Sequence, residues 1–272
     1  MSSVARLARR ALTKVWGTPR TEPWFNNLKQ EQIGEVWFES PQDTPLLIKF
    51  LFTSQSLSIQ VHPDDEYARR RHGCLGKTEM WHILRADEGA KIAIGLRRPI
   101  TREELAAVAG KPEILELLNW VEVRPGDTFF IPAGTIHALG GGLALCEIQQ
   151  LSDITYRLYD YGRDRELHIP QGLDVSRLAP GNGRREPILI ESGRELLTEC
   201  PYFRTEKLVI SAATLCEPHH IGIVLEGEVW SEDEMFGPGD AFATGNQGCE
   251  IESEHAVIVS VTAQCGAVET AK

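Results

Sequence analysis

VEVRPGDTFFIPAGTIHAL, residues 121–139, is the stretch that decides the fold. It reads as a strand, a Pro-Gly-Asp turn, a second strand and a second turn made by Pro132 and Gly134. Proline fixes φ and glycine tolerates left-handed backbone angles, so both residues favour tight turns. Short strands joined by such turns are typical of antiparallel β-barrels and sandwiches. The second turn would present His137 at the mouth of a barrel.

Two stretches upstream read as strands with one polar face each. SLSIQVH (56–62) alternates between polar and apolar residues, which is the period of a half-buried strand. Its polar face consists of Ser58, Gln60 and His62, and its other face of Leu57, Ile59 and Val61. KTEMWHIL (77–84) alternates in the same way, so Lys77 and Glu79 share one face and His82 lies on the other.

Two further stretches read as buried or long strands. LLIKFLF (46–52) is apolar except for Lys49, which reaches either a functional site or, from an edge strand, the solvent. LALCEIQQLSDITYRLYDY (143–161) reads as one long strand. Its alternation places Asp153 and Arg157 on the same face, about 13 Å apart along the strand, which is too far for a direct pair.

Three stretches read as helices. Pro63 followed by two aspartates predicts a short helix that ends near Gly73. The capping-box pattern of residues 101–104 predicts a helical insert over about 101–119. The first 16 residues, MSSVARLARRALTKVW, are predicted to form a short surface helix that leads into the domain.

The second half of the chain repeats one turn of the first half. After a linker at 178–187 the sequence contains PGDAF (238–242), which matches PGDTF (125–129). When the two are aligned, Glu250 stands where the first copy has His137, so the second copy lacks the histidine-bearing turn. The sequence thus predicts a first domain over 1–182 and a smaller degenerate β unit over 183–272.

Composition narrows the class of protein. The 272 residues are 42% hydrophobic, enough for a large core, and the formal net charge of -11 argues against a nucleic-acid partner. No apolar stretch is long enough to span a membrane. The six cysteines are scattered without a C-x-x-C pair and no secretory leader is evident, so we expect reduced thiols and a cytoplasmic protein, either monomer or homodimer.

Four motifs in order resemble the short bacterial type I mannose-6-phosphate isomerases of the cupin superfamily. They are QVHPDD (60–65), GKTEMW (76–81), PAGTIHAL (132–139) and SDITYRLYDYGR (152–163). The resemblance implies a cupin barrel with a helical insert, followed by a degenerate cupin-like unit. It also implies an aldose–ketose isomerase that interconverts mannose 6-phosphate and fructose 6-phosphate through a cis-enediolate, so a small hexose 6-phosphate would be the partner.

The resemblance implies a catalytic metal held by four residues, namely Gln60, His62, Glu79 and His137. The family metal is zinc, one ion per chain. Two imidazoles, a carboxylate and an amide suit Zn²⁺ and also accept Fe²⁺, Mn²⁺ or Co²⁺. Gln60 either binds the metal or hydrogen-bonds to the substrate, because an amide is a weak ligand.

The resemblance also assigns catalytic roles to Lys77, Arg157 and Asp153, and places Lys49 at the active site. Lys77 either accepts the proton or stays charged and holds a substrate oxygen or the phosphate. Arg157 suits bidentate binding of phosphate or enediolate oxygens, and Asp153 either orients a hydroxyl or transfers a proton. Ser58 shares the polar face of its strand with Gln60 and is expected to contact the substrate.

One departure and two alternatives remain. Longer family members carry a histidine just before the lysine of the K-x-E motif, where this chain has Gly76, so a relay through that histidine does not transfer. Arg163 and Arg165 are predicted to be solvated, and His219-His220 to be unliganded. The alternative functions are a non-catalytic cupin that binds a sugar phosphate and a different metal-dependent cupin enzyme, such as an Fe²⁺ oxygenase.

Overall fold

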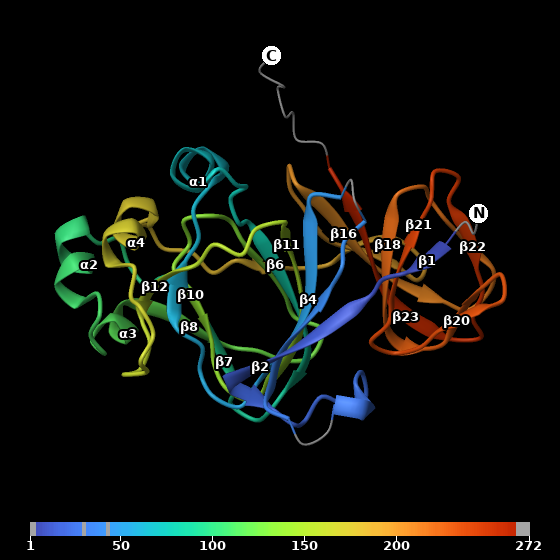
Figure 1. Ribbon diagram of the computed structural model, residues 1–272, viewed down its shortest axis with the longest axis horizontal. Helices are drawn as coiled ribbons and strands as arrows, with labels where there is room; N and C mark the ends of the chain where they lie inside the picture. Colours follow the sequence, from blue (N-terminus) through green and yellow to red (C-terminus); the bar gives the residue numbers. More distant parts are fainter. Residues whose placement is uncertain (1–3, 29–30, 42–43, 265–272) are drawn as a thin grey trace, which may run out of the picture.

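The computed structural model describes residues 4–28, 31–41 and 44–264, and most of its elements are antiparallel strands (Figure 1). The prediction of a mainly β fold is confirmed. Within the described ranges, no helix is long and apolar enough to cross a membrane.

Two sheets face each other and form a barrel. The larger has the strand order β13 (Arg184–Arg185), β9 (Thr128–Ile131), β6 (Glu79–Ala86), β11 (Leu143–Gln150), β4 (Leu46–Thr53), β3 (Ile33–Phe38) and β2 (Arg9–Thr18). The smaller has the order β12 (Tyr156–Tyr159), β5 (Ile59–Val61), β10 (His137–Leu139), β7 (Lys91–Leu96) and β8 (Leu118–Glu122). Their facing sides share one apolar cluster, which includes Leu51, Trp81, Ile92, Phe129 and Leu139.

Helices cover the outer face of the smaller sheet (Figure 1). α2 (Arg102–Val108) and α3 (Ile114–Leu117) lie in the predicted insert, and α4 (Ile169–Val175) lies beside α2. The insert is less helical than predicted. Gly110, with φ of 80°, and Pro112 interrupt the helix, and the chain enters β8 at Leu118.

The short helix after Pro63 is confirmed as α1 (Asp65–His72). The Asp64 side chain accepts a hydrogen bond from the Tyr67 N–H at 2.9 Å and caps the first turn. Gly73 ends the helix with φ of 67°, a left-handed angle that glycine adopts without a Cβ clash.

A third sheet lies beside the barrel. Its strand order is β1 (Val4–Arg6), β21 (Ala241–Thr244), β18 (His220–Gly227), β23 (Ala256–Ala263), β16 (Phe203–Ile210), β15 (Arg194–Glu199) and β14 (Ile188–Glu191). Two small ladders complete this C-terminal unit, β17 (Thr214–Cys216) with β22 (Cys249–Ile251) and β19 (Val229–Ser231) with β20 (Glu234–Phe236).

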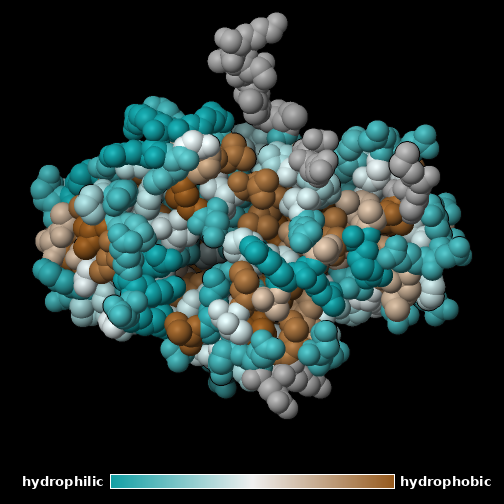
Figure 2. Space-filling model, in the orientation of Figure 1, coloured by the Kyte–Doolittle hydropathy of each residue, from teal (hydrophilic) through white to brown (hydrophobic). Residues whose placement is uncertain are grey.

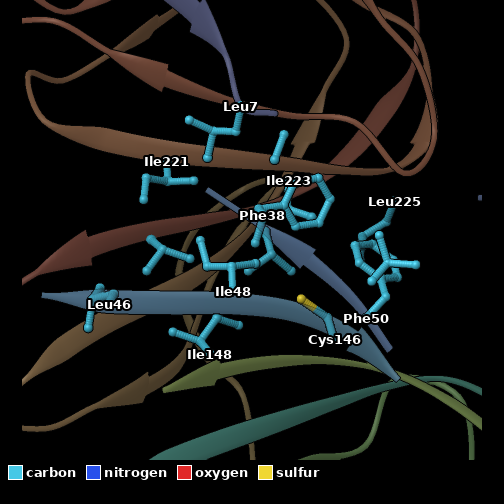
Figure 3. Packing of buried hydrophobic residues seen from close by; sticks show 14 of the residues in the cluster. Leu7, Phe38, Leu46, Ile48, Phe50, Cys146, Ile148, Ile221, Ile223 and Leu225 are labelled. Carbon is cyan, nitrogen blue, oxygen red and sulfur yellow. The ribbon is translucent and has the colours of Figure 1, made fainter. Parts of the chain in front are cut away.

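The largest apolar cluster joins the barrel to the C-terminal unit (Figure 3). Alternate residues of β4 point to this cluster, and Ile48 and Phe50 among them meet Ile221, Ile223 and other residues of the third sheet. All eight residues of β4 are buried, because its other face lines the barrel. The surface view is mostly hydrophilic on the side shown, as expected when the apolar faces cover each other (Figure 2).

Two predictions are wrong, the helix at the N-terminus and the single long strand over 143–161. The N-terminal segment forms β1 and β2 instead of a helix, because β21 and β3 supply backbone partners that its local sequence does not reveal. The predicted strand over 143–161 is broken, since β11 ends at Gln150 and β12 begins at Tyr156. Asp153 therefore lies in a loop between two strands of different sheets.

The two Pro-Gly-Asp turns have the same hydrogen bonds. Gly126 N–H donates to Ile83 O at 2.8 Å, and Gly239 N–H donates to Val224 O at 2.9 Å. Asp127 accepts from the backbone N–H three residues earlier at 2.8 Å, and Asp240 does so at 3.0 Å. The turns therefore occupy corresponding places in the larger barrel sheet and in the third sheet.

Phe50 is fully buried in the apolar cluster at the joint between the two units. Its ring lies 5.3–6.3 Å from the rings of four other aromatic residues, namely Trp24, Phe25, Phe38 and Phe52. Phe50→Ala is expected to lower the free energy of unfolding by about 3–5 kcal/mol, because it leaves a cavity in a packed core. Urea denaturation measures the change. Val15→Ala, at a side chain that is 68% exposed, is the control, and an equal effect of both would contradict this packing.

Candidate metal centre and active-site cavity

Three buried side chains from different strands converge inside the barrel. His62 follows β5, Glu79 begins β6 and His137 begins β10. One ligand atom of each lies within 4.8 Å of the others. His137 Nε2 is 3.4 Å from Glu79 Oε1, and His62 Nε2 is 3.7 Å from Glu79 Oε2. The structure thus brings these three predicted ligands together, and the fourth, Gln60, lies beside His137.

Backbone bonds hold the three segments in place. Gly134 N–H donates to His62 O at 2.8 Å, and Lys77 N–H donates to Pro63 O at 3.0 Å. Gly134 has φ of 85°, and a Cβ there would come within 2.9 Å of Val175 O. Only glycine suits this turn, which sets the start of the strand that carries His137.

Both imidazoles are oriented by the backbone. Nδ1–H of His62 donates to Ile154 O at 2.8 Å, and Nδ1–H of His137 donates to Thr135 O at 2.9 Å. Burial lowers the pKa of His137 to about 4, and burial together with the Lys77 amine lowers the pKa of His62 well below its usual value. Both rings are therefore neutral at neutral pH, with Nε2 lone pairs that face Glu79 and are available to a metal.

Glu79 has the character expected of a metal ligand. Neither carboxylate oxygen has a hydrogen bond in the described part of the chain, although Oε2 lies 2.9 Å from Lys77 Nζ. Burial raises its pKa to about 7 against the lowering effect of Lys77. A divalent cation between Glu79 and the two imidazoles would satisfy these oxygens. The residues present therefore fit a metal.

Gln60 is placed beside His137 by strand pairing. The two residues are register partners, and the Gln60 amide nitrogen lies 3.2 Å from His137 Nε2. Ser58 Oγ donates to Gln60 Oε1 at 3.3 Å, so Ser58 contacts Gln60 as well as the cavity. A 180° flip of the Gln60 side-chain amide would place its oxygen, instead of its nitrogen, next to His137, as metal ligation requires.

A cavity of about 210 Å³ opens beside this centre. Six of the predicted site residues line it, namely Lys49, Ser58, Gln60, Lys77, Asp153 and Arg157. Its lining carries five lysines and arginines against three carboxylates, in a chain of net charge -11. This local excess of positive charge favours an anionic ligand.

Lys77 touches both the cavity and the metal centre. Its Nζ lies 2.9 Å from Glu79 Oε2 and 3.1 Å from His62 Nε2. Burial acts to lower the pKa of this amine, but the Glu79 and Glu147 carboxylates outweigh it and raise the pKa above its usual value. In this arrangement Lys77 carries a positive charge.

Arg157 presents an unpaired guanidinium. No carboxylate of the described residues lies within 4.0 Å of it, and its Nε is buried without a hydrogen bond. Burial, with help from nearby Arg165, lowers its pKa. Arg163 and Arg165 are not solvated as predicted, because both pair with the buried Asp160, Arg165 through two contacts of 2.6 Å.

Lys49 points into the barrel and not to solvent. Its Nζ lies 3.4 Å from Glu147 Oε1, 4.0 Å from Asp153 Oδ1 and 4.4 Å from the centre of the Trp37 ring. The side chain is only 4% exposed. The edge-strand alternative is thereby wrong, and Lys49 and Asp153 meet at the cavity wall.

Glu147 is the residue that sequence reasoning missed. It is buried on β11 opposite Lys49, and its Oε2 accepts a hydrogen bond from Trp81 Nε1 at 3.0 Å. Burial raises the pKa of Glu147, but Lys77 and Lys49 outweigh burial and lower it, so the group is an ionised carboxylate. An acidic residue inside the apolar run LALCEI was the available signal, equivalent to the lysine in LLIKFLF.

The other histidines stay outside the centre. His82 faces away from Glu79 as predicted, with Nδ1 2.9 Å from Thr128 Oγ1. His220 contacts Ser260 Oγ at 2.9 Å and Thr262 Oγ1 at 3.2 Å, which is a packing role. Among the described residues, only His62, Glu79 and His137 form a group of potential ligands.

Comparisons with known proteins agree with this geometry. The chain is 35% identical to the mannose-6-phosphate isomerase of Streptococcus mutans over 238 residues, 81% of this chain and 75% of that protein. The chain belongs to the mannose-6-phosphate isomerase family. It is also 42% identical to mannose-6-phosphate isomerase ManA of Bacillus subtilis over 198 residues, 68% of this chain but only 62% of ManA, less than two thirds of its length. No family model matches.

Solved structures show the family fold. The crystal structure of the Bacillus subtilis mannose 6-phosphate isomerase has a TM-score of 0.84 and 28% identity, over 95% of this chain and 99% of that one. A zinc-bound mannose 6-phosphate isomerase has a TM-score of 0.78 at 16% identity, over 97% of this chain and 100% of that one, which shows a shared fold alone. The predicted cupin barrel is confirmed.

Removal of the Glu79 charge tests the metal centre. Glu79→Gln keeps the side-chain shape but loses the anionic ligand. Loss of a residue that only supports a metal ligand typically lowers metal affinity by about 10–100-fold, and loss of the ligand itself is expected to lower the affinity for Zn²⁺ by more. Elemental analysis after dialysis, with isothermal titration, measures the loss. His82→Gln, on the opposite face of the same strand, is the matched control. Unchanged zinc content in Glu79→Gln would rule out this centre.

Proposed function

We propose that this chain is a metal-dependent isomerase that interconverts mannose 6-phosphate and fructose 6-phosphate. The reaction moves a proton between C2 and C1 of the sugar through a cis-enediolate. It therefore requires a stabiliser for two adjacent oxygens, a group that carries the proton and an anchor for the phosphate. The observation that carries the proposal is the convergence of His62, Glu79 and His137 beside a cation-lined cavity, in a member of this family.

We assign the metal to His62, Glu79 and His137, with Gln60 as a fourth ligand, and propose one zinc ion per chain. Neutral imidazoles and a buried carboxylate support zinc, and Fe²⁺, Mn²⁺ or Co²⁺ would suit the same donors. Bound there, the metal would act as a Lewis acid that polarises the two substrate oxygens.

The cations of the cavity have different surroundings and hence different proposed roles. Lys77 lies against the metal ligands, so its charge would stabilise developing negative charge on the substrate oxygens. Arg157 has no carboxylate partner among the described residues, so its guanidinium would bind the phosphate in a bidentate manner. Lys49 is held by Glu147 and Trp37 and would act as a positioned donor to the sugar.

The proton carrier is proposed to be Glu147. Glu79 is assigned to the metal, and Lys77 lies 2.9 Å from its carboxylate, so both groups are placed at the metal centre. Glu147 is ionised, lines the cavity and is anchored by Trp81. Asp153, which is 69% exposed and near Lys49, is assigned to a sugar hydroxyl.

The second unit is proposed to be a degenerate copy of the barrel. Its sheet order matches that of the larger barrel sheet strand for strand, with β21, β18 and β23 in the places of β9, β6 and β11. The shared Pro-Gly-Asp turn supports this, and by register His220 stands where the barrel has Glu79. Its role is to cover the apolar outer face of the barrel.

The five described cysteines are free thiols, which supports a cytoplasmic location.

Two substitutions test the cation assignments. Lys77→Met is expected to lower kcat by about 10²–10³-fold, because it removes electrostatic stabilisation from the reaction centre. Arg157→Ala is expected to raise KM for the phosphorylated sugar and to lower kcat/KM. A coupled isomerase assay with zinc-loaded protein measures both. Lys91→Met is the control, since Lys91 pairs with Glu122 and neither residue lines the cavity. Full activity in both test variants would contradict the assignments, and a zinc-loaded parent without activity would contradict the function.

Glu147→Gln tests the proton carrier separately. The amide preserves the hydrogen bond from Trp81 but cannot accept the proton, so kcat is expected to fall by about 10²–10⁴-fold. Exchange of the substrate C2 proton with deuterated water, followed by NMR, should fall in parallel while zinc binding persists. If exchange stays at the parental rate, another group carries the proton.

A further inference from the structure

Cys216 and Cys249 occupy directly opposed positions on two short strands. In the β17–β22 ladder, Cys216 is the register partner of Cys249. Opposed Cα atoms of antiparallel strands are about 4.5–5.5 Å apart. Disulfides join Cα atoms about 4.4–6.8 Å apart, so the backbone already has the spacing that a disulfide requires.

The two thiols touch each other. Both cysteines are free and buried, each about 5% exposed. The Cys216 thiol donates a hydrogen bond to the Cys249 sulfur, which lowers the pKa of Cys249 to about 7 and raises that of Cys216. Cys249 is therefore the thiol of the pair that ionises more readily, and the thiolate is the nucleophile in disulfide chemistry.

A cavity reaches one member of this pair, Cys216, next to its register partner Cys249. A cavity of about 250 Å³ in the C-terminal unit is lined by Cys216 together with Arg194, Glu217 and His220. By contrast, Cys146 is fully buried between the two units, where its register partners are Phe50 and His82. Among the described cysteines, only Cys216 and Cys249 are register partners.

We propose that Cys216 and Cys249 are a modification site, at which they form a reversible disulfide that ties β17 to β22. With hydrogen peroxide as the oxidant, the Cys249 thiolate attacks one oxygen and the O–O bond breaks, which leaves a sulfenic acid and hydroxide that takes up a proton to become water. The Cys216 sulfur then attacks the sulfenic sulfur, the S–O bond breaks and a second water leaves with the Cys216 proton. Two thiols and one peroxide thus give one disulfide and two waters, and a dithiol reverses the change.

The disulfide would link two short strands of the C-terminal unit, β17 and β22. It closes a loop that contains β18, β19, β20 and β21, and so constrains the unfolded chain. β22 lies at the end of this unit remote from β10 and β12 of the barrel (Figure 1). We therefore expect oxidation to raise Tm by about 5–10 °C and to leave isomerase activity unchanged.

The experiment uses the full chain with Cys265→Ser, because Cys265 lies outside the described residues. The protein is oxidised with a small excess of hydrogen peroxide, blocked with an alkylating agent and cleaved after glutamate without reductant. The sequence then places the two cysteines on separate peptides, Lys207–Glu217 and Met235–Glu250. The expected result is one linked species, two hydrogens lighter than the sum of the peptides, that dithiothreitol splits.

Variants and an internal reporter decide the outcome. Cys216→Ser and Cys249→Ser should each abolish the linked species and the rise in Tm, while Cys146→Ser should keep both. Cys74 is only partly buried and reports that the oxidant has acted. Oxidised Cys74 without a link between Cys216 and Cys249 would overturn the proposal, and so would sulfinic acid at either cysteine in place of the link.

Discussion

Four charged side chains buried inside an apolar barrel impose the constraint on which the rest of the structure depends. Lys49, Lys77, Glu79 and Glu147 are each at most 4% exposed. Buried charges are tolerated only when partners compensate their lost hydration. Each lysine therefore forms an ion pair with a glutamate, Lys49 with Glu147 and Lys77 with Glu79. Three members of this network, Lys49, Lys77 and Glu147, line the cavity.

The barrel can hold this network because apolar residues surround the charged ones on its larger sheet. They lie on the outer face of the sheet and beside the charged residues on the inner face. On β4, alternate residues support the joint with the C-terminal unit, while Lys49 and Leu51 face inward. The C-terminal unit packs against the strands of this sheet, although none of its described residues belongs to the group of potential ligands. It covers the outer face of the strands that carry Lys49, Glu79 and Glu147.

Local electrostatics differ from those of the whole molecule. A net charge of -11 would repel a sugar phosphate, but the cavity lining carries more cations than carboxylates. One of these cations, Arg157, has no carboxylate partner in the part of the chain that the structure describes, whereas Arg165 is neutralised by Asp160. A cation that lines the cavity is therefore available to a phosphate only if no carboxylate of the protein already forms an ion pair with it.

The sequence by itself determined the residues whose position follows from local periodicity and turn chemistry. Strand alternation paired Lys77 with Glu79 and turned His82 away, and the Pro-Gly turn placed His137 at a strand start. Only the tertiary structure decided the contacts that depend on partners distant in sequence. The strands at the N-terminus, the break at 151–155, the neutralised Arg165 and the placement of Glu147 opposite Lys49 are of this kind. Periodicity reports which face a side chain takes, but the partner across that face comes from another part of the chain.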